Sequence, residues 1–182
     1  EHYLSTLVCF LFVDDWIAGA MAVQLAIWIW AAISKLNPHF SSVLCVMLSN
    51  SPLFRSETLR KRLYKKFPED LRPSKAAERL ARAGMLVELC FPLLLAFGGG
   101  SQAALAGLVV MALFHAFIAG NFPMAVPIEW NVMTVYGAVF LFGFQGDPAV
   151  WSISSPLLAV YLLAALVAVP LYGNLRPDRV SF

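Results

Sequence analysis

The distribution of charge along this chain constrains its fold more than any other feature. Ten of the thirteen lysines and arginines lie between Leu53 and Gly84, and the rest of the sequence consists largely of apolar stretches. Only 13% of the 182 residues are charged, whereas roughly a quarter of the residues are charged in soluble proteins. Because 60% of the residues are hydrophobic as well, the chain is predicted to be an integral membrane protein.

Composition also argues against two classes of function. The basic segment, residues 55–83, contains acids as well as cations, and the net charge is only +2, so no nucleic-acid partner is expected. The three cysteines, Cys9, Cys45 and Cys90, form no pairwise motif and lie in apolar surroundings. Cysteine there behaves as a small hydrophobic residue, so neither a disulfide framework nor a metal site is indicated.

The apolar stretches are long enough for helices that cross a membrane, which takes about 20 residues each. We therefore expect an all-α fold over residues 1–182, a single polytopic helical domain with about five spans. The expected spans cover residues 16–34, 85–97, 103–118, 132–144 and 155–172. The run 4–13 is shorter and is interpreted as the tail of an earlier span. The chain begins with Glu1 instead of Met, which indicates a piece of a longer polypeptide.

Glycine and proline mark the borders of these spans. The run Gly98–Ser101 suits a tight turn far better than a helix interior, so the two spans that it joins are predicted to form a hairpin. Further turns are expected at residues 120–123 and 145–148.

The first span is followed by a segment that is too interrupted to cross the membrane. Trp16, Trp28 and Trp30 lie near the ends of the span, as in an aromatic belt at the membrane interfaces. Residues 39–54 are apolar but broken by serine, asparagine and proline. This second segment is therefore predicted to be re-entrant or interfacial.

The basic segment is predicted to lie at a membrane surface. Apolar residues recur between Leu59 and Phe67 at the spacing of an amphipathic helix. A second helix is expected to start after Ser74, a suitable N-cap, and to run from Lys75 into the membrane near Gly84. The alternatives are a solvated loop that only fixes topology, a surface helix that also fixes topology, and a specific site for anionic lipid or a protein partner.

The distribution of cations also predicts orientation. The positive-inside rule places residues 55–82 in the cytoplasm, and the predicted spans return Arg176 and Arg179 at the C-terminus to the same side. Asp14, Asp15 and Asp147 then lie on the opposite side.

Three ionisable residues, Lys35, Glu88 and His115, lie in or beside apolar segments, where burial of charge is costly. Lys35 ends its span on the cytoplasmic side. With a rise of about 1.5 Å per residue, Glu88 lies roughly 6 Å in from that side, and His115 about as far. The three are therefore predicted to share one layer, where they can offset one another's desolvation and exchange protons.

Each of these residues has a structural interpretation as well. Lys35 can reach the headgroups from a helix end, His115 can hydrogen-bond between helices, and Glu88 can pair with either of them. A lysine acts as a base only when desolvation or a nearby cation lowers its pKa, and a neighbouring carboxylate does the reverse. A direct Lys35–Glu88 pair would argue against catalysis. Glu88 holding His115, with Lys35 facing an apolar cavity, would suit proton transfer from a quinol-like lipid.

Short motifs along the chain resemble one known membrane family. In order, they are Trp30–Asn37, Phe40, Ser51–Leu53, Val87–Leu89, Phe114–His115, Gly120–Pro123 and Glu129–Asn131. Together they are similar to the horizontally transferred transmembrane (HTTM) domain of vitamin K-dependent gamma-carboxylase and its bacterial relatives. The likeness covers about residues 16–145 and extends to actinobacterial-type membrane proteins, which implies the bacterial inner membrane.

This resemblance implies roles for five residues. In the carboxylase, the lysine that Lys35 resembles is the base linked to oxygenation of reduced vitamin K. By resemblance, Lys35 is the catalytic base, His115 and Glu88 support it, Asn37 and Asn121 contribute to cofactor binding, and a reduced quinone is the cofactor. Asn37 replaces the usual aspartate of the family, and these residues contain no soluble substrate-binding region. Carboxylation of a glutamate substrate is therefore not expected.

Three functions follow as alternatives. The first is a membrane-embedded enzyme or binding protein for a quinone- or isoprenoid-like lipid, favoured by a large apolar cavity beside an unpaired Lys35. The second is a non-catalytic scaffold or accessory subunit that docks a partner through the basic segment, favoured by a Lys35–Glu88 pair without a cavity. The third is a transporter or lipid-handling component, favoured by half-helices that point at a midplane site.

Overall fold

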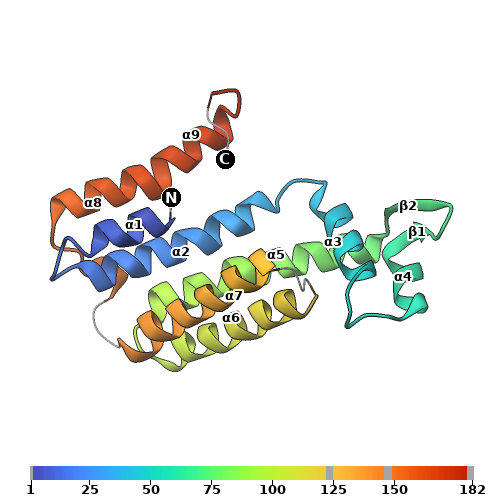
Figure 1. Cartoon of the computed structure of the whole chain (residues 1–182), viewed down its shortest axis with the longest axis horizontal. Coiled ribbons are helices and arrows are strands. Elements are labelled where there is room, and N and C mark those ends of the chain that lie inside the picture. Colours follow the sequence, from blue (N-terminus) through green and yellow to red (C-terminus); the bar gives the residue numbers. More distant parts are fainter. Residues whose placement is uncertain (1, 122–124, 146–148, 180–182) are drawn as a thin grey trace.

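The computed structural model describes residues 2–121, 125–145 and 149–179 and consists largely of helices (Figure 1), which confirms the all-α prediction. The α-helices are α1 (His2–Cys9), α2 (Trp16–Ser34), α3 (Phe40–Ser49), α4 (Glu57–Leu63), α5 (Lys75–Gly98), α6 (Gln102–Asn121), α7 (Ala125–Ala138), α8 (Pro156–Leu163) and α9 (Val169–Leu175). The π-helical stretch η1 (Val139–Phe144) continues α7, η3 (Ala164–Ala168) joins α8 to α9, and η2 (Val150–Ser152) is a 3-10 turn. Strands β1 (Tyr64–Lys66) and β2 (Asp70–Pro73) pair in an antiparallel hairpin.

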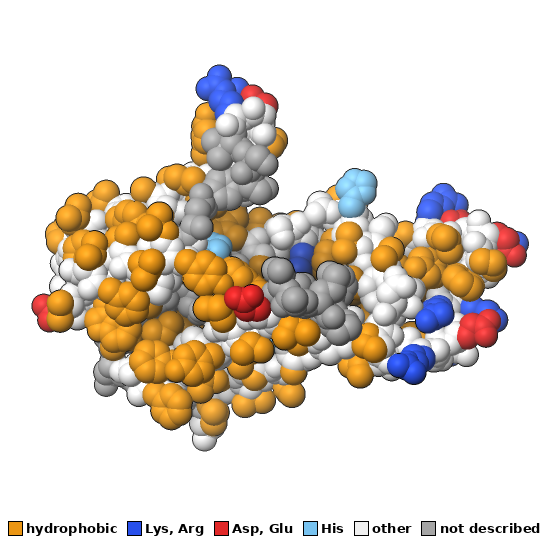
Figure 2. All heavy atoms as spheres, viewed as in Figure 1, with side chains coloured by type: hydrophobic (Ala, Val, Ile, Leu, Met, Phe, Trp, Pro, Cys, Tyr) orange, Lys and Arg blue, Asp and Glu red, His pale blue; other side chains and the backbone are white. Residues whose placement is uncertain are grey.

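Among the described residues, four helical segments are long and apolar enough to cross a membrane. They are Trp16–Ser34, Lys75–Gly98, Gln102–Asn121 and Pro156–Leu175. The remaining predicted span, residues 132–144, falls on a shorter apolar helix, Ile128–Phe144. Between 22 and 44% of the residues in each spanning window are buried, so apolar side chains cover much of the outer face (Figure 2). Helices solvated by lipid are expected to present such a surface.

Helix α2 lies at the centre of the bundle. Its Leu25 and Trp28 pack with Phe91 of α5 in one apolar cluster, while α1 and α8 cover another side of the helix. Gly19 permits the close approach of α1, because a Cβ at this position would lie 2.7 Å from the Cys9 Sγ. The apolar α2 sequence is therefore explained by contacts on several sides.

Two of the three tryptophans predicted for an aromatic belt, Trp28 and Trp30, are engaged with other helices. Trp28 is only 1% exposed and lies inside the bundle. Trp30 donates its indole N–H to the Leu166 carbonyl at 2.7 Å. Leu166 belongs to η3, and a π-helical stretch departs from the regular α-helical bonding ladder, which makes a carbonyl available to such a donor. Both side chains thus join helices, which a position near a span end does not reveal.

The predicted hairpin between two spans is confirmed. Helix α5 ends at Gly98, and Gly99 and Gly100 adopt φ values of 47° and 70°. Glycine reaches this left-handed region at little cost, which explains the run of glycines before α6. The predicted turn residues Phe122 and Pro123, and residues 146–148 including Asp147, lie outside the described residues.

Asp15 fixes the start of α2 to the start of α8. Its buried carboxylate accepts hydrogen bonds from the Ser154 and Ser155 backbone N–H groups, at 2.9 and 2.7 Å, and from the Ser154 hydroxyl. Ser155 in turn caps α8. The Ser154 N–H and the other two donors favour the ionised carboxylate and hold the pKa of Asp15 below its usual value.

We expect Asp15 to stabilise the fold in a pH-dependent way. A depressed pKa in the folded state contributes stability that is fully present above the unfolded-state pKa, near 4, and is lost as the pH falls through the folded-state pKa. Asp15→Ala is therefore expected to lower the melting temperature at pH 7 and to weaken its fall in acid. Thermal melts of both proteins in mild detergent between pH 7 and pH 3 test this. If the melting temperature of the variant were lower than that of the wild type by the same amount at every pH, the stabilising role of the ionised Asp15 would be contradicted.

A small module extends beyond the end of the bundle (Figure 1), and we call it the basic module: α3, α4, the β1–β2 hairpin and the first turns of α5. Its core consists of Leu44, Cys45, Leu48, Leu63, Ala77 and Ala81. Helix α3 packs on this module, while Ser51 in the loop after it bonds to Asn121 at the end of α6. The position of α3 in the module favours the interfacial interpretation of residues 39–54 over the re-entrant one.

The predicted amphipathic helix between Leu59 and Phe67 is wrong in its second half. Helix α4 ends at Leu63, and Tyr64 starts β1. Pro68 disfavours helical geometry at the residue before it, Phe67, and the chain turns into the hairpin instead. The rings of Tyr64 and Phe67 lie 5.8 Å apart there.

The start of α5 agrees with the prediction. Ser74 caps the helix, since its hydroxyl accepts a hydrogen bond from the Ala77 N–H at 3.2 Å. From there α5 runs without interruption from the basic module to Gly98.

Candidate functional site

The candidate site is built around an ion pair between two spanning helices. Lys35 follows the last turn of α2 as its C-cap, Glu88 lies within α5, and the Lys35 Nζ donates to the Glu88 Oε2. The Glu88 side chain is 4% exposed and the Lys35 side chain 22%, so the pair lies at the edge of the packed bundle. The prediction that these two residues share one layer is confirmed. A buried carboxylate needs such a partner.

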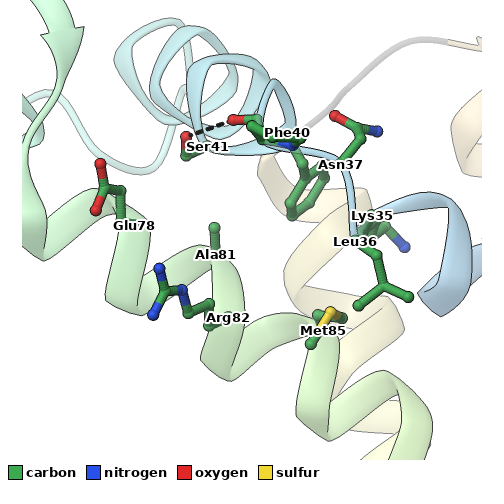
Figure 3. A pocket seen from close by; sticks show the side chains of 10 residues that line it. Lys35, Leu36, Asn37, Phe40, Ser41, Glu78, Ala81, Arg82 and Met85 are labelled. Carbon is green, nitrogen blue, oxygen red and sulfur yellow. Dashed lines mark hydrogen bonds between the residues drawn. The ribbon is translucent and has the colours of Figure 1, made fainter.

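A cavity of about 450 Å³ lies beside Lys35, between the α2–α3 loop, α3 and α5 (Figure 3). Leu36, Phe40 and Met85 give it apolar walls. Its polar groups come from Asn37, Ser41, Glu78 and Arg82. The cavity is therefore amphipathic.

The Lys35 ammonium does not point into this cavity. In Figure 3 it points away from Glu78 and Arg82, and its nitrogen is the one that pairs with Glu88. It also lies 5.9 Å from the centroid of the Phe40 ring. Lys35 thus forms an edge of the cavity while its charge is compensated by Glu88.

His115 does not contact Glu88, and this corrects the arrangement that would suit proton transfer from a quinol. Its Nε2 accepts the indole N–H of Trp28 at 2.9 Å, and its Nδ1 lies 2.5 Å from the Asn131 Oδ1. Because Nε2 is an acceptor, the ring proton is assigned to Nδ1, which donates to Asn131. Both ring nitrogens of His115 are therefore used in linking α6 to α2 and α7.

The two asparagines that the resemblance assigns to cofactor binding occupy different places. Asn37 lines the cavity and donates to the Ser34 carbonyl at 2.7 Å. Asn121 is 3% exposed, accepts the Ser51 hydroxyl at 2.6 Å and donates to the Phe117 carbonyl. Asn121 thus joins the end of α6 to the loop after α3 and does not line the cavity.

Sequence reasoning did not identify Arg82 as a site residue. The sequence does contain a pattern that could have identified it. One face of α5 carries residues that recur at intervals of three or four, namely Glu78, Arg82, Met85 and Glu88. Two partners of His115, namely Trp28 and Asn131, were also missed as site residues. Their pairing joins three helices, which no spacing within one helix predicts.

The chemistry of this site favours binding over base catalysis. The Lys35 ammonium is engaged by a carboxylate, and His115 has both nitrogens in hydrogen bonds. Arg82 offers a guanidinium, whose N–H groups bind carbonyl or phosphate oxygens well, and no ion pair is assigned to it among the described residues. The groups present suit an acceptor-rich polar head with an apolar body.

A second and larger space has a different character. A groove of about 640 Å³ lies between α2, α5 and the α8 segment and is lined by apolar residues such as Ile29, Phe97, Trp151 and Leu163. Among the described residues, no ionisable side chain lines it. The described lining therefore lacks the chemistry of the Lys35 site and suits hydrocarbon.

Comparison with known proteins places the chain in a family. No curated protein and no solved structure matches it. A family of transmembrane proteins, DUF3556, matches over residues 1–182, which agrees with the spanning helices described above. The chain therefore belongs to DUF3556, a family of transmembrane proteins of unknown function.

Proposed function

We propose that this membrane protein binds a quinone- or isoprenoid-like lipid, with the polar head of the lipid in the cavity beside Lys35. The observation that carries the proposal is the amphipathic cavity of about 450 Å³, which has Arg82 and Asn37 on its polar side and Phe40 on its apolar side. Arg82 and the Asn37 amide donate to carbonyl or phosphate oxygens, and the Phe40 ring packs on the head.

The place of the cavity in the fold supports a ligand that comes from the bilayer. Lys35 ends the spanning helix α2, and α5 passes the cavity before it continues as a span to Gly98. If the polar head of the lipid binds in this cavity, its apolar tail begins at the level where the hydrocarbon core of the membrane begins. The resemblance of Trp30–Asn37 to the HTTM domain supports the quinone class in particular. Lys35 forms an edge of the cavity with its charge held by Glu88, and turnover by Lys35 is not part of this proposal.

The same proposal includes an orientation. The basic module carries ten lysines and arginines between Leu53 and Gly84, so we place it and the C-terminus on the cytoplasmic side of a bacterial inner membrane. The lipid site then faces the cytoplasmic leaflet.

We expect a quinone or isoprenoid to co-purify with the protein and to depend on Arg82. Lipids extracted from the wild type in mild detergent are identified by mass spectrometry and compared with those from Arg82→Ala. Removal of one charge-assisted hydrogen bond is expected to lower retention about tenfold.

The matched control is Arg79→Ala, which removes an exposed cation from the same helix but not from the cavity. It is expected to retain the lipid at the wild-type level. If the wild type carries only bulk phospholipid, or if both variants lose the lipid equally, the proposed site is wrong.

A second candidate function, a non-catalytic scaffold, is favoured by the polar links between helices. Lys35 pairs with Glu88, His115 joins Trp28 to Asn131, and Ser51 bonds to Asn121. Links of this kind rigidify a bundle whether or not it holds a ligand. A wild-type protein without a specific lipid, in a stable complex with another membrane protein, would support this candidate instead.

A further inference from the structure

The basic module carries a surplus of positive charge that its own acids do not neutralise. The stretch between Leu53 and Gly84 contains ten lysines and arginines but only four acids. Among the described residues, the ion pairs of this module are Lys61 with Glu57 and Arg72 with Asp70. Exposed cations outside these pairs include Arg55, Arg62, Lys65, Lys66 and Lys75. Figure 2 shows blue side chains gathered at this end of the molecule.

The length of helix α5 places these cations at the membrane surface. The helix has 24 residues, which at about 1.5 Å each extend roughly 36 Å, and the hydrocarbon core is only about 30 Å thick. The excess of about 6 Å equals about one turn, so the first turn of α5 projects to the level of the headgroups. This turn contributes Ala77 to the core of the basic module, so the module is held at that level.

Helix α3 gives independent support for contact with the bilayer. One face of α3 is buried in the module through Leu44, Cys45 and Leu48. On its other side, Val43 and Val46 are 50 and 58% exposed. An interfacial helix inserts such an apolar face at the boundary between headgroups and acyl chains. The cations of the same module then lie beside the phosphates.

We propose that the basic module binds the headgroups of anionic phospholipids in the leaflet that α5 enters. Lys65 and Lys66 on β1 are exposed and have no assigned ion pair among the described residues, so they are the central contacts. Charge complementarity favours phosphate over other partners, because anionic lipids attract clustered lysine and arginine next to a spanning helix. This site is separate from the cavity beside Lys35 and does not depend on its ligand.

Hydrogen exchange on the full chain in nanodiscs tests this proposal. The discs contain phosphatidylcholine alone or phosphatidylcholine with phosphatidylglycerol, and exchange is followed over residues 60–73 by mass spectrometry. We expect exchange in the hairpin to slow several-fold with phosphatidylglycerol and to recover in high salt, which screens surface charge.

A charge-removing variant and a matched control sharpen the test. Lys65→Gln/Lys66→Gln should lose most of the lipid-dependent slowing, whereas Arg176→Gln/Arg179→Gln, which removes two cations from the C-terminal end, should keep it. Unchanged exchange in α5 checks that each variant is folded. Equal exchange in both kinds of disc would overturn the proposal, as would slowing that appears only in native membranes, which would point to a protein partner.

Discussion

Lys35→Met is expected to destabilise the protein by about 3 kcal/mol, because it leaves the Glu88 carboxylate buried without its cation. Loss of one partner from a buried pair costs about 3–5 kcal/mol. The lower end applies here because the Lys35 side chain is 22% exposed, so the pair is only partly desolvated. Unfolding by denaturing detergent, followed by circular dichroism, measures the change.

Substitution of the other partner of the pair provides the control. In Glu88→Leu, the partly exposed Lys35 side chain can turn its ammonium toward solvent or headgroups, so the expected cost is only about 1 kcal/mol. The double variant Lys35→Met/Glu88→Leu replaces the pair by apolar groups and is expected to return close to wild-type stability. If the two single changes cost the same and their effects add, the pair is not an energetic link between α2 and α5.

His115→Ala is expected to cost about 3 kcal/mol, since it leaves the buried Trp28 N–H without its acceptor and opens a void among α2, α6 and α7. His115 is 4% exposed. Leu113→Ala, on the same helix but 66% exposed, should change stability by less than about 0.5 kcal/mol. Chemical or thermal unfolding in one detergent compares the two.

Lipid retention separates this structural role from the catalytic role implied by the HTTM resemblance. Trp28→Phe removes the indole donor to His115 but not the His115 imidazole, and we expect it to destabilise the protein while the lipid is retained. A His115→Ala protein that is as stable as the wild type but has lost its lipid would show that His115 contacts the ligand directly. That result would contradict the hydrogen-bonded core described above.

Local signals predicted the spanning helices and their ends well. The apolar runs located Trp16–Ser34 and Gln102–Asn121, the serine at position 74 capped α5, and the glycines after α5 formed its turn. The depth of each residue along its helix also predicted that Lys35 and Glu88 lie in one layer, because a regular rise per residue fixes the layer of a side chain.

Depth does not fix the direction in which a side chain points, and this explains the failures. His115 faces Trp28 and Asn131, and Trp28 faces the core and not the interface. The wall that Phe40 gives to the cavity depends on how α3 packs against α5, which is a tertiary contact. Helix spacing also favoured a continuous helix through Tyr64, where the hairpin forms instead.

The most direct test of the lipid site is photo-crosslinking with a prenylated quinone that carries a diazirine on its head, followed by peptide mapping of the wild-type protein in nanodiscs. The account predicts adducts on Leu36, Phe40 or Met85 that decrease when unlabelled quinone is added. Adducts confined to the apolar groove around Phe97 and Trp151, or spread over the lipid-facing surface without competition, would contradict it.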